Sequence, residues 1–389
     1  MKYWRGYLTA GIFAVISWAL MAAAERYSTL VDMVYPYVTR SVQSFLVAWT
    51  SGFDFCVWQI AILVFLVVCL AALVLVFVFK GSIVQWLGWV LAAVSIVFCL
   101  HTGVYGLNYY AGPIEDDLRL EMTDYTQSEL EAALMFYRDQ ANYMAVQLSR
   151  DEQGLARYPD FEELAQQTGE GFRNLMMERS FSIFGGDYTP VKKLGWADLY
   201  SSVGVSAVTS FVTGEAAVNP QIPAISQPFV MSREIARRLC VAREDAASFA
   251  AYLACEASPS REYQYSGYFM AFRYCYNALH AADPIAAMRI REGCSSELLW
   301  DLEHYHNFYT SHENSQNKDV ADTVHDVFLK ISGDRDGIAA DGAVCDYLVN
   351  WYLAEYTTEE EITQEFDPYD ETQVDLSGIG NARPPENGE

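Results

Sequence analysis

Basic residues are scarce in this chain of 389 residues. Lys and Arg number 25 against 50 Asp and Glu, which gives a formal net charge of −25 at pH 7. Proteins bind nucleic acid through Lys and Arg side chains that neutralise its phosphates. We therefore expect that this strongly acidic protein binds no nucleic acid.

Paired cysteines are also lacking. The eight cysteines form no C-x-x-C pair, and five of them follow residue 104 without regular spacing. An odd number of cysteines in one part of a chain is not a disulfide framework. We expect buried free thiols instead.

Charge is sparse in the first 104 residues, which carry five basic and three acidic groups, whereas the remaining 285 residues carry 20 and 47. Three charge-free apolar stretches in this part are long enough to cross a bilayer, which takes about 20 residues. The first ends in "LMAAAER", similar to a signal cleavage site, but we interpret it as an uncleaved anchor. The predicted spans are residues 7–24, 57–79 and 83–104.

The few charges near the spans predict their orientation. Lys2 and Arg5 precede the first span, Lys80 lies between the second and third, and basic residues favour the cytoplasmic side. We therefore expect a multi-pass plasma-membrane protein with a cytoplasmic N-terminus and an extracytoplasmic C-terminal domain. Residues 25–55, between the first two spans, have the apolar spacing of a helix lying on the membrane.

Three regions follow: a membrane domain (1–104), an extracytoplasmic domain (105–356) and an acidic tail (357–389) expected to be disordered. Thr126 and Glu129 form a capping-box pattern before an apolar helical stripe. Residues 180–230 are rich in Val, Thr, Ser, Gly and Pro and predict one or two short strands. The expected fold is mainly α with a small β element, and helical texture recurs at 232–257, 262–281, 295–308, 318–331 and 340–356.

One helical stretch, "SREIARRLCVARED" at 232–245, has the spacing of the zinc-binding motif H-E-x-x-H. In that motif, two histidines at i and i+4 bind zinc and the glutamate between them is the general base. Arg and Glu are common on solvated helix faces, so the stretch alone is a weak signal.

The surrounding sequence makes the signal stronger. "TGEAAVN" (213–219), "PF" (228–229), "REIAR" (233–237), "AREDAASF" (242–249) and "YSGY" (265–268) stand in one order, after three spans. In this respect the chain resembles a bacterial membrane family, domain of unknown function family thirty-eight-ten, over essentially its whole length to residue 356. Members of that family resemble zinc metalloproteases of the H-E-x-x-H type, so the resemblance implies a zincin-like domain.

The departures from the family pattern concern the zinc ligands. Arg233 and Arg237 stand at the two histidine positions, Ala246 at a candidate third ligand, and Cys240 at a glycine. The general-base position, Glu234, and the first acids of the following run, Glu244 and Asp245, keep their residue types. Arginine offers no lone pair to a metal, so we expect neither zinc nor any other cofactor.

Other acidic residues near the motif survive. By resemblance, Glu215, Asn219, Glu244 and Asp245 line the cleft beside the motif helix. Because guanidinium groups pair well with carboxylates, we expect the two arginines to replace the ion's charge by pairing with Glu234, Glu244 or Asp245.

The resulting expectation is a catalytically inactive metalloprotease-like membrane protein that acts by binding, as a scaffold, regulator or sensor at the cell surface. A peptide or protein in the former cleft, or an anion on the arginines, would be its partner beside the membrane itself. One alternative is an active membrane-anchored zinc metallopeptidase that uses Glu234, Glu244, Asp245 and a distant histidine. Another is a purely structural envelope protein with a collapsed cleft.

Overall fold

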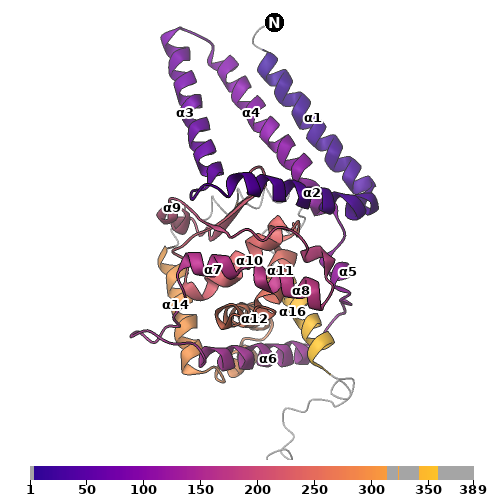
Figure 1. Ribbon diagram of the computed structural model, residues 1–389, viewed down its shortest axis with the longest axis vertical. Coiled ribbons are helices and arrows are strands. Elements are labelled where there is room, and N and C mark those ends of the chain that lie inside the picture. The colour runs from indigo at the N-terminus through magenta and orange to yellow at the C-terminus, as the bar shows by residue number, and fades with distance from the viewer. Residues whose placement is uncertain (1–3, 313–322, 324–340, 358–389) are drawn as a thin grey trace, which may run out of the picture.

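Long apolar helices stand on a mostly helical body in the computed structural model of the chain (Figure 1). The structure describes residues 4–312, 323 and 341–357. The predicted helix at 318–331 falls almost wholly outside these residues, as does nearly all of the acidic tail.

The three predicted spans are helices of 22 residues each, long and apolar enough to cross a membrane. Two of them pack closely, because a Cβ at Gly6 would lie only 2.5 Å from the backbone of Gly88. Small residues permit such close helix contacts. The three helices are α1 (Arg5–Arg26), α3 (Val57–Val78) and α4 (Ile83–Val104).

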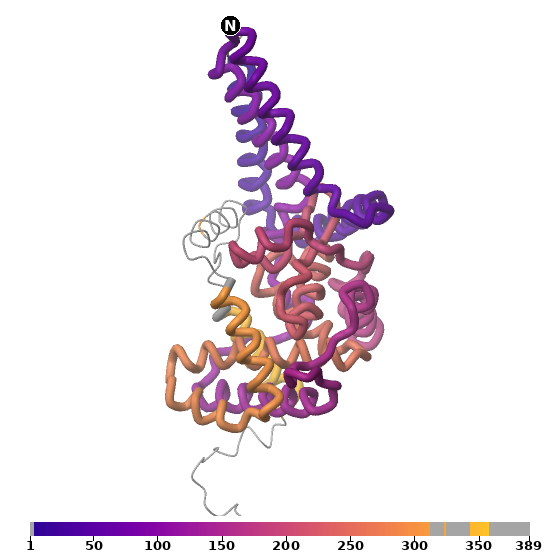
Figure 2. Tube along the Cα trace, turned by 90° about the vertical axis from the view of Figure 1, so that its left-hand side faces the viewer, coloured from indigo at the N-terminus to yellow at the C-terminus, as the bar shows by residue number. Residues whose placement is uncertain are grey.

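The segment between the first two spans is helix α2 (Ser28–Thr50), as predicted. It runs across the ends of α1, α3 and α4 and separates them from the body (Figures 1 and 2). One face is exposed and apolar, for example at Phe45 and Trp49. The opposite face of α2 packs against the body, and there Gln43 Nε2 donates to the Phe211 carbonyl at 2.9 Å.

The body is built around α12, a long helix that packs on α6, α10, α11 and α16. The predicted capping box of α6 is present, because Thr126 accepts from the Glu129 N–H and Glu129 accepts from the Thr126 N–H. The helical segments are η1 (Gly106–Tyr110), α5 (Ile114–Leu118), α6 (Gln127–Ala145), α7 (Phe161–Gln167), α8 (Gly169–Glu178), η2 (Ser182–Phe184), α9 (Ala197–Ser202), η3 (Ala224–Ser226), α10 (Gln227–Arg238), α11 (Glu244–Glu256), α12 (Arg261–Ala282), α13 (Pro284–Arg291), α14 (Ser296–His312) and α16 (Asp341–Tyr356).

Two predictions for the body need correction. The helix expected at 232–257 is two helices, because the chain turns between Arg238 and Glu244. The β element has three short strands instead of one or two. The middle strand, β3 (Glu215–Val218), pairs in parallel with β1 (Lys192–Lys193) and antiparallel with β2 (Ala207–Ser210).

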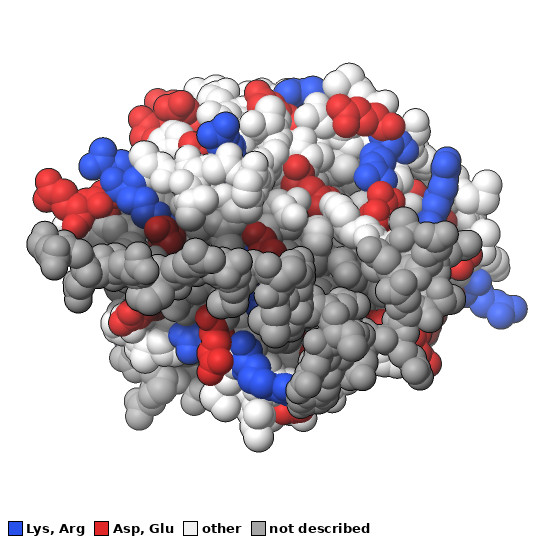
Figure 3. All heavy atoms as spheres, turned by 90° about the horizontal axis from the view of Figure 1, so that it is seen from below, with Lys and Arg blue, Asp and Glu red and all other residues white. Residues whose placement is uncertain are grey.

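All eight cysteines are free thiols, as predicted, and six of them are buried. On the face opposite the apolar helices, acidic and basic side chains of the described residues are intermingled (Figure 3). Most of the exposed large apolar side chains of the described residues lie on α1 to α4, and a smaller number lie on the body.

Candidate functional site

The motif helix α10 ends in a conformation that suits glycine. Cys240 follows it with a φ of 75°, in the left-handed region. The N–H of Val241 donates to the Ala236 carbonyl at 3.1 Å, which completes a Schellman-type helix end. This conformation favours glycine. Position 240, where the sequence resemblance predicts a glycine, therefore has a backbone conformation that favours glycine, although the residue is cysteine.

Two of the three arginines of α10, Arg233 and Arg237, face Glu244, the first residue of α11. Arg233 Nη1 lies 3.5 Å from Glu244 Oε1, and Arg237 Nη2 contacts Glu244 Oε2. Arg233 Nε also donates to Glu234 Oε1 at 3.1 Å. The Arg233, Arg237 and Glu244 side chains are 17%, 14% and 20% exposed. The expected pairing with Glu234 and Glu244 is therefore present, in largely buried surroundings.

Glu234 lies at the centre of this network and is 1% exposed. Its Oε2 accepts a hydrogen bond of 2.6 Å from the Thr209 hydroxyl. Burial by itself would raise the pKa of the Glu234 carboxyl. The guanidinium charges of Arg237 and Arg233, with the Thr209 hydrogen bond, bring that pKa below its ordinary value instead. Glu234 is therefore held as a carboxylate.

Strand β2 and the residue just before it supply hydrogen-bond partners for Glu234 and Arg233 that sequence reasoning missed. Thr209 binds Glu234, and the Ser206 hydroxyl accepts from Arg233 Nη2 at 3.2 Å. The sequence feature that could have indicated these partners is the stretch "VSAVTS" before the motif helix, which carries three hydroxyl side chains. That signal does not say which hydroxyl would face α10, because the packing of the hairpin on the helix decides it.

Asp245 and Ala246 stand apart from the arginine pair. Asp245 pairs with Arg243, whose Nη2 lies 2.8 Å from its Oδ2, so it is the one of the three candidate acids that does not pair with Arg233 or Arg237. Ala246 is buried in the main apolar core and lines a different cavity. The carboxylate that contacts both Arg233 and Arg237 is that of Glu244, and Ala246 lies away from the two arginines.

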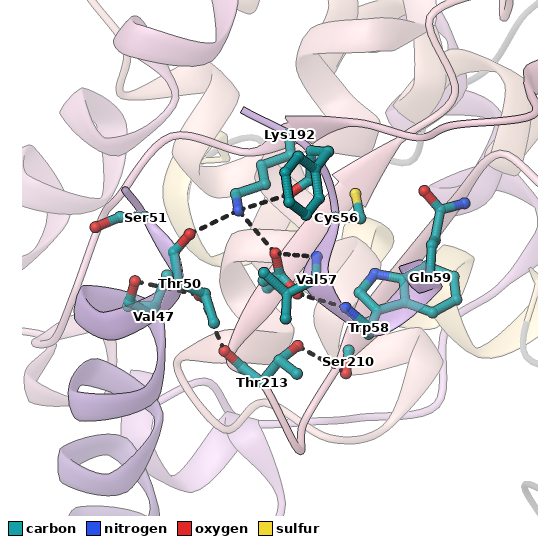
Figure 4. Close-up of polar contacts among 12 residues, drawn as sticks. Val47, Thr50, Ser51, Cys56, Val57, Trp58, Gln59, Lys192, Ser210 and Thr213 are labelled. Atoms are coloured by element: carbon teal, nitrogen blue, oxygen red, sulfur yellow. Dashed lines mark hydrogen bonds and ion pairs between the residues drawn. The ribbon is translucent and has the colours of Figure 1, made fainter. Parts of the chain in front are cut away.

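Glu215 belongs to a second polar cluster, at the start of α3. Figure 4 shows its partners Val57, Trp58 and Lys192. Its Oε1 accepts from the Val57 N–H at 2.9 Å and from Lys192 Nζ at 2.7 Å. Its Oε2 accepts from the Trp58 N–H at 3.0 Å. The carboxylate thus caps an apolar helix that is 22 residues long. It ties the sheet of the body to the membrane-type helices.

The side chain of Asn219 also has partners other than Arg233 and Arg237. Its side chain is fully buried, donates to the Ser201 hydroxyl at 2.9 Å, and accepts from the Gln221 N–H at 3.0 Å. It therefore shapes the loop after β3. The structure brings together Arg233, Glu234, Arg237 and Glu244, but gives Glu215, Asn219, Asp245 and Ala246 other contacts.

The residues at this centre do not fit a zinc ion. Zinc in proteins is bound by Cys, His, Asp or Glu, and a guanidinium has no lone pair to give. Two guanidinium groups contact the carboxylates that would otherwise be left for a metal. Across residues 4–312, 323 and 341–357, no three His, Cys, Asp or Glu side chains are grouped to hold a metal.

Two cavities lie elsewhere in the body. One of about 640 Å³ lies between α12 and α14 and is lined by Arg273, Tyr305 and Tyr309, among others. The other, of about 390 Å³, lies between α2, η1 and the α10–α11 turn. Neither is lined by the four residues of the ion-pair network. The network is thus a packed centre beside these cavities.

Fold and centre together define a mostly helical protein with three helices suited to a membrane and an arginine–glutamate centre on a buried helix. The chain belongs to the family described as "Protein of unknown function (DUF3810)", whose model matches residues 31–349. Comparisons with curated proteins and with solved structures give no match.

Proposed function

We propose that this protein is a catalytically inactive, metalloprotease-like membrane protein, in which paired arginines take the place of a zinc ion. The observation that carries the proposal is the network of Arg233, Arg237, Glu234 and Glu244. Arginine stands at both positions where H-E-x-x-H has histidine, and both arginines contact the same carboxylate of the next helix.

The charges support this substitution. Two guanidinium groups carry the same total charge as one divalent ion, and the carboxylates of Glu234 and Glu244 balance either. A buried carboxylate without a cation is costly, because the ion has lost its hydration. The arginines therefore let the two helices pack with these acids in place, without a metal.

Catalysis is not supported by the same network. A metallopeptidase glutamate takes a proton from a metal-bound water whose pKa the ion has lowered. Glu234 instead accepts hydrogen bonds from Arg233 and Thr209. We infer that the protein works by binding, as a scaffold, regulator or sensor. Its body lies outside the cytoplasmic membrane in this proposal, which rests on the positions of Lys2, Arg5 and Lys80.

The test is the zinc content of the purified full chain, measured by elemental analysis after incubation with zinc and desalting. The matched variant is the double substitution Arg233→His and Arg237→His, which offers two ligands one helical turn apart beside Glu244. We expect less than stoichiometric zinc in the wild type and about one zinc per chain in the double variant. Adding Glu244→Gln to the double variant should remove the gain.

Stoichiometric zinc in the wild type would overturn the proposal, and so would a peptidase activity that Glu234→Gln abolishes. The wild-type measurement decides even where the double variant does not fold. A folded double variant that binds no zinc would show that the two positions and Glu244 lack metal-site geometry, against the metalloprotease-like part of the proposal.

A further inference from the structure

The cavity of about 390 Å³ lies at the boundary between the membrane-type helices and the body. One wall is α2, and another is η1, which begins at Gly106, directly after α4. Met33 and Tyr37 on the α2 wall are 67% and 56% exposed. The α2 wall of the cavity therefore carries exposed apolar side chains. Helix α2 lies across the ends of α1, α3 and α4 (Figure 1), at the level where lipid headgroups would lie if these three helices cross a bilayer.

Three oxygen acceptors line this cavity. Asp32 and Asp117 are exposed, and the Asp32 Oδ1 also accepts from the Gly112 N–H at 2.8 Å. Asn108 is only 5% exposed, and its Oδ1 accepts no hydrogen bond within the part of the chain that the structure describes. A buried acceptor without a donor is unusual. Together these oxygens suit a group with several N–H donors and a positive charge.

The electrostatics agree with this reading. Desolvation and the nearby Asp32 carboxylate raise the pKa of Asp117 above its ordinary value, although Arg40 opposes the shift. Neither Asp32 nor Asp117 forms an ion pair with a described residue. A cation in the cavity would relieve the repulsion between the two carboxylates.

Two guanidinium groups, those of Arg40 and Arg243, also line the cavity, and Arg243 pairs with Asp245. Arg40 donates from Nη1 to the carbonyls of Ser182, Ile183 and Gly185, at 3.0 to 3.2 Å. Within residues 4–312, 323 and 341–357 no carboxylate lies in ion-pair distance of it. A guanidinium held by neutral carbonyls keeps its full charge and suits a phosphate.

We propose that this cavity binds the headgroup of a phospholipid with a primary ammonium, phosphatidylethanolamine. Its ammonium donates to Asp117, Asp32 and Asn108, its phosphate lies near Arg40, and its acyl chains run beside Met33 and Tyr37. The choline headgroup has no N–H to donate, and the glycerol headgroup has no positive charge. The site therefore distinguishes lipids by the chemistry of their amine.

The experiment uses the full chain in nanodiscs with equal amounts of phosphatidylethanolamine, phosphatidylcholine and phosphatidylglycerol. The protein is then transferred to mild detergent, and the lipids that stay bound are quantified by mass spectrometry. We expect the wild type to retain phosphatidylethanolamine in preference to both others. Asp117→Asn should lower that preference about fivefold, as loss of one partly exposed ion pair does. Asp116→Asn, the adjacent acid outside the cavity lining, should retain it.

A second readout is the melting temperature of the folded protein with and without added lipid. It does not depend on how much of a variant folds. Added phosphatidylethanolamine should raise the melting temperature of the wild type and of Asp116→Asn, and raise it less for Asp117→Asn. The proposal would be overturned if the three lipids are retained in the equal proportions of the nanodisc, or if phosphatidylglycerol is preferred. Equal effects of Asp116→Asn and Asp117→Asn would also overturn it. Equal binding of soluble glycerophosphoethanolamine would show an amine site that does not select a membrane lipid, and would also overturn it.

Discussion

Removing Arg233 tests whether the arginines hold the centre together. In Arg233→Met the side chain keeps its approximate bulk but loses its charge and its hydrogen bonds to Glu234 and Ser206. Glu234 is 1% exposed, so water does not replace the lost partner. The variant therefore leaves a buried carboxylate with Thr209 and the more distant field of Arg237.

The size of the effect follows from the pair. Two unit charges at the 3.1 Å between Arg233 Nε and Glu234 Oε1 attract by about 5 kcal/mol at an effective dielectric constant of about 20. Breaking one side of a buried pair typically costs about 3–5 kcal/mol. Because Arg237 still favours the Glu234 carboxylate, we expect the lower end, about 3 kcal/mol. At about 2–4 °C per kcal/mol for a large domain, the melting temperature should fall by about 6–12 °C.

The assay is thermal unfolding of the full chain in detergent, followed by intrinsic fluorescence at several pH values. The pKa of Glu234 is lowered in the folded state, so its contribution is present above the ordinary carboxyl pKa of about 4.3 and is lost as the pH falls through the folded value. The difference between wild type and Arg233→Met should therefore be largest near neutral pH and shrink in acid.

The control is Lys193→Met, which also removes one cation. Lys193 pairs with Glu162, and their side chains are 48% and 66% exposed, so solvent screens the pair. We expect its melting temperature to stay close to that of the wild type. An Arg233→Met variant as stable as Lys193→Met, or one whose loss is the same at every pH, would refute the claim that Arg233 compensates a buried charge.

Two further substitutions test other acidic residues of the body. Glu256 Oε1 accepts from the hydroxyls of Tyr252 and Tyr356 at 2.5 and 2.6 Å, and burial raises the pKa of the Glu256 carboxyl. The contribution of Glu256 to stability is therefore present below its unfolded pKa and is lost as the pH rises through the folded value. Glu256→Gln should melt at a higher temperature than the wild type at pH 8, and this difference should close toward pH 4. Glu215→Gln should destabilise by about 3 kcal/mol, because it leaves Lys192 buried without its carboxylate, and should speed amide hydrogen exchange at Val57 and Trp58; unchanged exchange there would contradict the capping role.

Local patterns predicted much of the fold. The three spans follow from uninterrupted apolar runs, and the capping box at Thr126 follows from two residues three positions apart. Both features depend only on neighbouring residues. The break between α10 and α11 was missed because Leu239 to Ala242 are apolar and continue the helical texture, while the turn depends on the left-handed backbone of Cys240.

The centre was predictable only in part, because its partners come from distant segments. The spacing of Arg233 and Arg237 places both on one helix face, which the sequence shows directly. That Glu244, and not another acid, lies opposite them depends on how α11 packs on α10. Thr209 and Ser206 come from a hairpin whose register and packing no local pattern specifies.

The choice between Glu244 and position 246 illustrates the limit. Residues two apart on a helix point about 200° away from each other, since each residue turns the helix by about 100°. If one of them faces α10, the other faces away from it. Glu244 contacts both arginines, so position 246 points into the core, where Ala246 is buried at 3% exposure. A carboxylate introduced at position 246 would therefore point away from a metal held by histidines at 233 and 237. Of these two positions, only 244 faces α10, which is why Glu244 is the residue removed in the zinc test.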